Sequence, residues 1–386
     1  MIDFDVLSEN QHDSSSVKIK IVGIGGAGGN TVNSMIDSDL EGVNFIVANS
    51  DLQALKLSKA SNKIQLGVKT TKGLGSGANP EVGKKATEED IDRIMEHLSG
   101  ADIAFVVAGM GGGTGSGGAP VIAKALRDRG ILSIAVVTMP FSFEGKRRMM
   151  VAEKALESLK KEVDTLIVVP NEKLLGLVDA SVSMIEAFDM INKVLIQSVK
   201  SISSIISRSG HINVDFADLR TIMKGKGLAM MGTGSATGAN RAVEAAKKAI
   251  ASELLENVNI KSARGVLLNV SAGSSLSLHE INAAAKVIYD ESDKDAEIIV
   301  GSVVDTSMGD ELVVSVVATG FPQAQAEIPL MTEKLVKTVP VKDEKKLNTE
   351  SQLAKVISEN TEVVSDNLEV PAYLRQQDAA NNKETE

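Results

Sequence analysis

The chain has 386 residues, which at about 150 residues per domain suggests two or three domains and excludes a small single-core protein. With 41 Lys and Arg against 51 Asp and Glu, the formal net charge is -10, which argues against nucleic acid as the main partner. The chain has no cysteine, which excludes disulfides and thiolate metal sites, and its four histidines offer few candidate zinc ligands.

The N-terminal segment, residues 1–16, carries four acidic side chains and no lysine or arginine, the opposite of a secretory signal. We predict that it is a solvated, disordered tail. No apolar run in the sequence approaches the roughly 18 residues that a transmembrane helix needs. We therefore expect a cytoplasmic protein that does not insert directly into a membrane.

The first predicted domain, residues 17–182, alternates short β-branched runs with longer stretches of helical spacing. This alternation predicts an α/β fold with a doubly wound parallel sheet, whose ligands bind outside the carboxyl ends of the strands. The predicted strands are residues 17–22, 43–48, 103–108, 131–138 and 165–169, and the predicted helices include residues 81–98, 120–129 and 146–162.

A long helix is predicted over residues 183–208, because apolar side chains recur there at three- and four-residue steps along about seven turns. It joins the first domain to a second α/β domain over residues 209–321. Within that domain the predicted strands are residues 227–233, 265–271, 296–304 and 311–318, and the predicted helices are residues 216–224, 239–255 and 278–290.

The rest of the chain is polar. Residues 322–367 have mixed charge and no sustained apolar period, which predicts a disordered linker. Residues 368–386 form a predicted partner-binding peptide, because apolar side chains gather again near its start. The segment from Leu368 to the charged Arg375 includes Val370, Pro371, Tyr373 and Leu374. A frayed terminus with incidental apolar residues is the alternative.

The first glycine motif follows the first predicted strand. Gly23, Gly25 and Gly28 match G-x-G-x-x-G in a strand-to-helix context, where bare backbone amides and a helix N-terminus face an anion. Phosphate binding is the functional interpretation, and a tight turn alone is the alternative. Asp51 follows the second predicted strand at about the distance of a ribose contact, so an NAD-dependent oxidoreductase also fits.

A second glycine loop follows the strand at residues 103–108. Its core, residues 111–117, reads Gly-Gly-Gly-Thr-Gly-Ser-Gly, and Pro120 is expected near the start of the next helix. Two such loops at successive strand ends can surround one polyphosphate. A dinucleotide fold does not require the second loop. Neither loop contains the lysine of a P-loop, so amides, helix dipoles and Mg²⁺ must offset the phosphate charge.

The string GGGTGSG is similar to the signature of the tubulin/FtsZ family. The chain resembles this family of bacterial tubulin-like cell-division GTPases in consecutive motifs over residues 17–321. The resemblance implies a tubulin/FtsZ-like fold, GTP or GDP with Mg²⁺ as ligands, and GTP hydrolysis that depends on head-to-tail assembly with itself. It places the phosphates against Gly25, Gly26, Ala27, Asn30, Gly111, Gly112, Gly113, Thr114, Gly115 and Ser116.

Further nucleotide contacts are implied by the same resemblance. Asn49 and Asp51 would lie near the nucleotide and its metal, although no metal ligand is assigned. The loop over the terminal phosphate would contain Gly75, Gly77, Ala78 and Asn79; the sugar contacts would be Glu144 and Arg148; the base contacts would be Asn171, Phe188 and Asn192. From the residues alone, Arg148 fits a solvated helix start, and Phe188 fits the apolar core.

Two carboxylates, Asp215 and Asp218, are three residues apart at a predicted helix start. By themselves they indicate an N-cap and a first-turn acid. With Asn213 they match the family's N-x-D-x-x-D loop, which implies that they orient the attacking water in the site of the next subunit. Phosphoryl transfer relies mainly on alignment and charge stabilisation, which suits this role.

Three classes of function remain open: an assembly-dependent GTPase, an oxidoreductase and a nucleotide-binding scaffold without catalysis. The resemblance favours the first. It also implies localisation to the mid-cell division site on the inner face of the membrane. Membrane tethers of the FtsA type and other division proteins would bind through the segment from Leu368 to Arg375.

Overall fold

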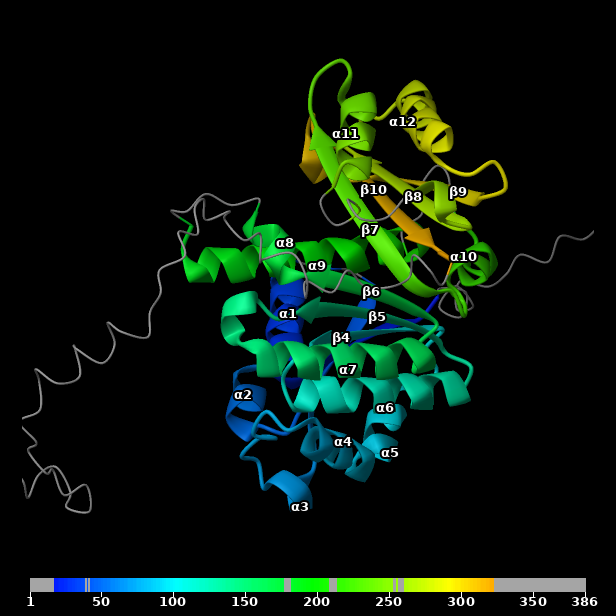
Figure 1. The fold of residues 1–386 in the computed structure, drawn as a ribbon. Coiled ribbons are helices and arrows are strands. Elements are labelled where there is room, and N and C mark those ends of the chain that lie inside the picture. Colours follow the sequence, from blue (N-terminus) through cyan, green and yellow to red (C-terminus); the bar gives the residue numbers. More distant parts are fainter. Residues whose placement is uncertain are drawn as a thin grey trace, which may run out of the picture. The chain divides into compact units, whose positions relative to one another are not determined.

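The computed structural model describes residues 17–322, except residues 39, 41, 177–181, 208–213, 253–254 and 256–259 (Figure 1). The predicted N-terminal tail, the linker beyond residue 322, the C-terminal peptide and Asn213 therefore lie outside the described residues. No helix in the described part of the chain combines the length and apolar composition needed to cross a membrane.

One ten-stranded sheet runs through the described residues, in the order β3-β2-β1-β4-β5-β6-β7-β10-β8-β9. The first six strands pair in parallel, in the order typical of dinucleotide-binding folds. This confirms the predicted doubly wound parallel sheet. The strands are β1 (Ile19–Ile24), β2 (Val43–Asn49), β3 (Asn62–Gln65), β4 (Ile103–Gly109), β5 (Leu132–Met139), β6 (Thr165–Pro170), β7 (Gly227–Ala236), β8 (Gly265–Ala272), β9 (Glu297–Val304) and β10 (Leu312–Thr319).

The second half of the sheet has mixed strand directions. β7 pairs in parallel with β6, whereas β10 is antiparallel to both β7 and β8. The strands of the two predicted α/β segments thus belong to one continuous sheet.

Helices cover both faces of this sheet. They are α1 (Gly25–Asp37), α2 (Leu52–Leu57), α3 (Val68–Thr71), α4 (Pro80–Glu89), α5 (Ile91–Leu98), α6 (Thr114–Asp128), α7 (Lys146–Glu162), α8 (Asn171–Leu175), α9 (Met184–Ser207), α10 (Phe216–Met223), α11 (Arg241–Ile250) and α12 (Leu278–Glu291). Short 3₁₀ turns are η2 (Ser142–Glu144), η3 (Ile260–Ser262) and η4 (Thr306–Met308).

Side chains of the buried strands alternate between two cores. On β4, Phe105 and Val107 pack in the core beneath α1 and α9, while Val106 and Ala108 pack in the core beneath α4, α5, α6 and α7. Because both faces are covered, the strands read as continuous apolar runs, which explains why they were predictable.

The long helix α9 does more than connect two segments. Its Leu195 and Val199 belong to the same core as Phe105 of the first half and Leu267 and Val317 of the second half. In Figure 1, α8 lies beside the start of α9 and α10 lies toward its end. The apolar stripe predicted for this helix therefore packs against both halves of the sheet.

Several predicted boundaries were wrong for a steric reason. α1 begins at Gly25, inside the first glycine motif, and α6 begins at Thr114, which leaves Pro120 inside the helix rather than near its start. At several of these helical glycines the neighbouring backbone leaves no room for a Cβ. A Cβ on Gly28 would overlap the Val107 carbonyl oxygen.

Other elements also differ from the prediction. The helix predicted over residues 81–98 is divided into α4 and α5 at Asp90. The Asp90 carboxylate accepts the Gly67 amide at 2.7 Å and pairs with Arg93 at 2.9 Å. The short elements β3, α2, α3 and α8 were not predicted, since runs of four to six residues carry little periodicity.

A buried ion pair holds the second half together. Arg241, at the start of α11 and 6% exposed, donates from Nε to Glu280 of α12 at 2.6 Å and from a terminal nitrogen to the Asp310 carbonyl at 2.8 Å. Glu280 also completes a capping box with Ser277. Hydrogen bonding from Arg241 lowers the pKa of Glu280 to about 2.

We expect Glu280→Gln to lower the free energy of unfolding at pH 7 by about 2–3 kcal/mol, because a buried guanidinium loses its counter-charge. A carboxyl with a lowered pKa stabilises the fold above its ordinary pKa, and this contribution is lost as the pH falls toward 2. The difference between wild type and variant, measured by urea unfolding, should therefore shrink below pH 4.5.

Glu291→Gln is the matched control, because its pairing with Lys261 at 3.7 Å joins two side chains that are more than half exposed. The expected link between the pKa of Glu280 and stability would be contradicted if the difference in the free energy of unfolding between Glu280→Gln and wild type stayed constant down to pH 2.5.

Candidate functional site

A cavity of about 490 Å³ opens at the carboxyl ends of β1 and β4. The strand order reverses at this place, because the chain passes from β1 outward to β2 and from β4 in the other direction to β5. α1 and α6, which follow β1 and β4, pack on opposite faces of the sheet. Ligands of open α/β sheets bind at such a reversal.

Two helix N-termini meet at the cavity. A Cβ on Gly25, the first residue of α1, would lie 3.0 Å from the backbone nitrogen of Gly115 in the first turn of α6. Both residues line the cavity. Each N-terminus presents unpaired amides and the positive end of a helix dipole, so the shared opening favours an anion.

The glycines of the two loops serve two different purposes. Gly113 and Gly117 are required by packing, since a Cβ would overlap the Ser76 hydroxyl or the Pro80 carbonyl oxygen. Gly26 and Gly112 line the cavity, and a Cβ on either would meet nothing within 4 Å. No atom of the described residues occupies the space where a side chain would stand at these two glycines. A ligand therefore has room to approach their backbone amides.

The opposite end of the cavity is built by α8 and α9. Asn171 is 5% exposed, and its Oδ1 has no hydrogen-bond partner among the described residues. Asn192 Oδ1 lies 3.0 Å from the Thr31 hydroxyl of α1. Phe188 is 41% exposed, so it belongs to the cavity wall rather than to the core. This end thus offers an aromatic ring and an unpaired buried acceptor.

The ring of Phe188 and one ion pair form the outer wall of the cavity. The Phe188 ring packs edge-on against Phe141 at 5.7 Å, and Phe141 stacks on Phe143 at 4.9 Å. Arg148 pairs with Glu144, which also accepts the Phe141 amide at 3.0 Å. Among the described lining residues, Arg148 is the one basic side chain and Glu144 the one carboxylate.

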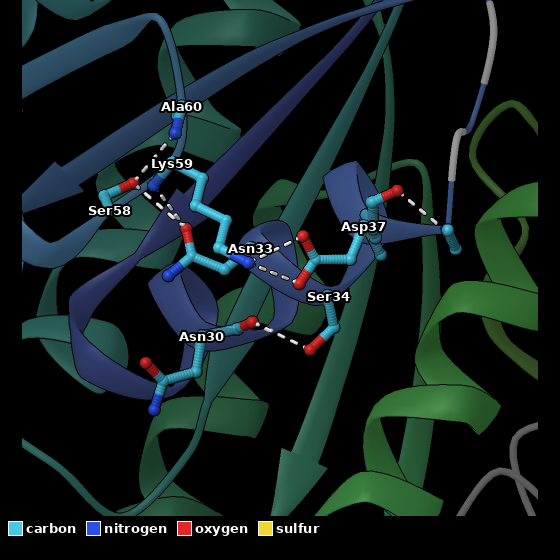
Figure 2. A network of polar contacts seen from close by, with 9 residues as sticks. Asn30, Asn33, Ser34, Asp37, Ser58, Lys59 and Ala60 are labelled. Atoms are coloured by element: carbon cyan, nitrogen blue, oxygen red, sulfur yellow. Dashed lines mark hydrogen bonds and ion pairs between the residues drawn. The ribbon is translucent and has the colours of Figure 1, made fainter.

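Most predicted binding residues come together here. The cavity is lined by Gly25, Gly26, Ala27, Asn30, Gly112, Gly113, Thr114, Gly115, Glu144, Arg148, Asn171, Phe188 and Asn192. In the network of Figure 2, the Asn30 carbonyl accepts the Ser34 hydroxyl, whereas the Asn30 side-chain amide joins none of the drawn contacts. The same network ties α1 to the chain before β3 through Asn33 and Lys59 at 2.7 Å.

The other predicted binding residues do not line the cavity. They are Asn49, Asp51, Gly75, Gly77, Ala78, Asn79, Gly111 and Ser116. Asn49 accepts the Asp51 amide, and Asp51 caps α2. Ser116 accepts the Gly111 amide at 2.9 Å, which closes the second glycine loop from behind. Of these residues, Ser116 supports the cavity wall from behind rather than forming it.

The two carboxylates lie at the other edge of the sheet. Asp215 is the N-cap of α10, and Asp218 lies in its first turn, as the residue pattern alone suggested. On the same helix, Arg220 donates to the Gly130 carbonyl at 3.2 Å, just before β5 begins. α10 therefore lies at the amino edge of the parallel strands, opposite the cavity.

Sequence reasoning missed several lining residues: Thr31, Ser76, Met110, Thr138, Met139, Pro140, Ile191 and Leu195. Thr138 could have been inferred from strand topology, because it is the next-to-last residue of β5 and pairs in register with Gly109 at the end of β4. Ser76 gave no signal beyond its position between predicted glycines.

Comparison with known proteins agrees with this arrangement. Residues 18–179 match the model of the Tubulin/FtsZ family, GTPase domain, and residues 227–322 match that of the FtsZ family, C-terminal domain. An FtsZ structure from M. jannaschii, an empty dimer, is 39% identical, with a TM-score of 0.77 over 81% of this chain and 93% of that one. CetZ1 from Haloferax volcanii, a GDP-bound monomer, is 25% identical, with a TM-score of 0.70 over 80% of this chain and 95% of that one.

We expect Gly117→Ala to lower the free energy of unfolding by about 2 kcal/mol or more, because the new methyl group meets the α4 backbone. Gly112→Ala should change it by less than about 0.5 kcal/mol, since its Cβ enters open space. Chemical denaturation of both variants measures the difference. Equal destabilisation would contradict the division of the glycines into packing and cavity positions.

Proposed function

Because the chain belongs to the tubulin/FtsZ family of GTPases, we propose that the cavity between β1 and β4 binds GTP and GDP and hydrolyses GTP. The observation that carries this proposal is the convergence of two helix N-termini on one opening, where Gly26 and Gly112 leave their backbone bare. Two such termini suit a chain of phosphates better than the single pyrophosphate turn of an NAD enzyme.

The nucleotide has one orientation that matches the polarity of the cavity. Its phosphates would lie against the N-termini of α1 and α6, and its base would lie against α8 and α9. The unpaired oxygen of Asn171 would accept an N–H group of the base, and guanine offers such donors at N1 and N2. Phe188 would pack against the base, and Arg148 would reach the sugar and phosphates.

Mg²⁺ is part of the proposal. The described residues contain no group of three or more His, Cys, Asp or Glu side chains arranged to hold a metal ion. Proteins commonly bind Mg²⁺ through one or two carboxylates together with substrate phosphates. Asp51 caps α2 and does not line the cavity, so no metal ligand is assigned; when bound, the ion would offset phosphate charge.

Hydrolysis would require a second copy of the chain. Asp215 and Asp218 are at the sheet edge opposite the cavity, so they cannot reach a nucleotide bound in their own subunit. If copies stack with one edge against the other, the acids of one subunit face the phosphates of the next. Together with Asn213, they would orient the attacking water. Such a head-to-tail contact does not close on itself and generates filaments.

In the cell, these filaments would form the cytokinetic ring at the mid-cell division site, on the inner face of the membrane. Tethers of the FtsA type would bind the segment from Leu368 to Arg375, which lies outside the described residues. Its apolar side chains would order on binding and anchor the contact.

The split site is tested by mixing two inactive variants. Asp218→Asn should lower GTP hydrolysis by roughly 10²-fold or more while leaving nucleotide affinity nearly unchanged, because a water-orienting group is lost. Gly112→Ala should lower nucleotide affinity, because the methyl group would occupy the space through which a phosphate reaches the backbone amides. In an equal mixture, about one quarter of random junctions pair an intact cavity with an intact acid, so phosphate release should recover toward that fraction.

Asp215→Asn serves as a second acid variant, since asparagine keeps the cap of α10. A mixture that releases phosphate no faster than the sum of its two components would rule out a site shared between subunits. Wild-type activity per subunit should also rise steeply with protein concentration, because the monomer lacks half of the site.

For the C-terminal segment, we expect truncation after residue 367 to leave GTP hydrolysis and light scattering by filaments unchanged. Binding to an immobilised FtsA-type tether should be lost, because the apolar anchor at Val370, Tyr373 and Leu374 is removed. Unchanged affinity of the truncated chain for the tether would place the contact on residues before 368.

A further inference from the structure

A chain of three hydroxyl groups runs from the interior of the protein to the wall of the cavity. Ser50, which follows β2 and is 0% exposed, has its Oγ 2.6 Å from Oγ1 of Thr114, the first residue of α6. Thr114 Oγ1 is in turn 3.0 Å from Ser76 Oγ. Thr114 and Ser76 line the cavity, whereas Ser50 does not.

Ser50 also holds the loop that carries Ser76. Its backbone carbonyl accepts the Gly75 amide at 3.1 Å and the Thr71 hydroxyl at 3.3 Å. The loop backbone depends on such anchors, because Ala78 adopts a left-handed conformation at φ 57° that side-chain-bearing residues disfavour. One buried residue therefore fixes both the start of α6 and the loop opposite it.

These hydroxyls lie at the end of the cavity farthest from the proposed base. Asn171, Phe188 and Asn192 come from α8 and α9, which pack with α1 on one face of the sheet. Ser76 precedes α4, and Thr114 begins α6, both on the other face. A nucleotide whose base lies against α9 would cross the strand ends and place its last phosphate beside Thr114 and Ser76.

Resting on the nucleotide site proposed above, we propose that Ser50 is a positioning residue for the terminal phosphate, which it never touches. It acts by holding the Thr114 hydroxyl and the loop of Ser76 where an additional phosphate group would be bound. The ligand feature that it selects is the third phosphate, which distinguishes GTP from GDP.

The donors and acceptors available to the three hydroxyl groups explain this role. A phosphate oxygen only accepts, so it needs a hydroxyl that directs its proton into the cavity. Among the described residues, Thr114 is the one hydrogen-bond partner of the Ser50 hydroxyl, and either oxygen of this pair could be the donor. When Ser50 donates to Thr114, the Thr114 proton is left for Ser76 or for a phosphate oxygen. In that arrangement Ser50 sets the direction in which Thr114 donates.

The test compares two ligands at protein concentrations below assembly: GDP and a GTP analogue whose β,γ-bridging oxygen is replaced by methylene. Ser50→Ala should weaken the analogue by about 5-fold and GDP by less than about 2-fold, on the scale of one hydrogen bond. The ratio of the two dissociation constants, measured by calorimetry, is the readout, because general structural damage would weaken both ligands alike.

Three further variants make the result specific. Ser50→Thr keeps the hydroxyl and should restore the wild-type ratio. Ser50→Cys has similar volume but donates weakly, so it should give an intermediate ratio even if Ser50→Ala folds poorly. Ser133→Ala removes an equally buried hydroxyl that donates to Asp164 at 2.9 Å near the amino end of β5, and it should leave the ratio unchanged.

The outcomes separate this proposal from the one on which it rests. If wild-type protein binds both ligands and every Ser50 variant keeps the wild-type ratio, the role of Ser50 is overturned and the nucleotide site stands. The same holds if the two affinities fall equally. If wild-type protein binds neither ligand, both proposals are overturned.

Discussion

The close approach of two helices at the ends of two paired strands is the constraint on which the rest of this structure depends. β1 and β4 are neighbours, and α1 and α6 start at or soon after their last residues. Side chains would prevent this, since a Cβ on Gly115 would lie 2.7 Å from the Gly109 carbonyl oxygen and one on Gly28 would overlap that of Val107. Glycine at these positions lets both N-termini converge on one cavity, and their amides and dipoles give it a preference for anions.

This constraint also separates what the sequence could predict from what it could not. The parallel strands were recognisable because burial on both faces makes them continuous apolar runs, as in β4. The starts of α1 and α6 were not, because glycine has low helix propensity and only tertiary contacts place it in a helix. The glycine loops were recognised through their motifs, whereas Asn171 and Asn192 were implied by the resemblance to the tubulin/FtsZ family. Ser76 and Thr138 enter the cavity through topology, which a linear pattern does not encode.

The long helix α9 relates the two ends of the proposed function. Near its start, Phe188 and Asn192 line the cavity, and its 24 residues extend for roughly 36 Å along the sheet. α10, with Asp215 and Asp218, follows it in the chain at the opposite edge. α9 packs against strands of both halves, which ties the half that carries the cavity to the half that carries the acids. In the proposed filament, the spacing between the cavity and the acids would become the repeat between successive sites.

The central claim is that the cavity between β1 and β4 is the nucleotide site, and a crystal structure of the protein with GDP bound tests it most directly. The account predicts phosphate oxygens within hydrogen-bond distance of backbone amides in the first turns of α1 and α6, and the base donating to Asn171 Oδ1 beside Phe188. GDP bound elsewhere, or bound here with its base against α6 and its phosphates against α9, would contradict the account.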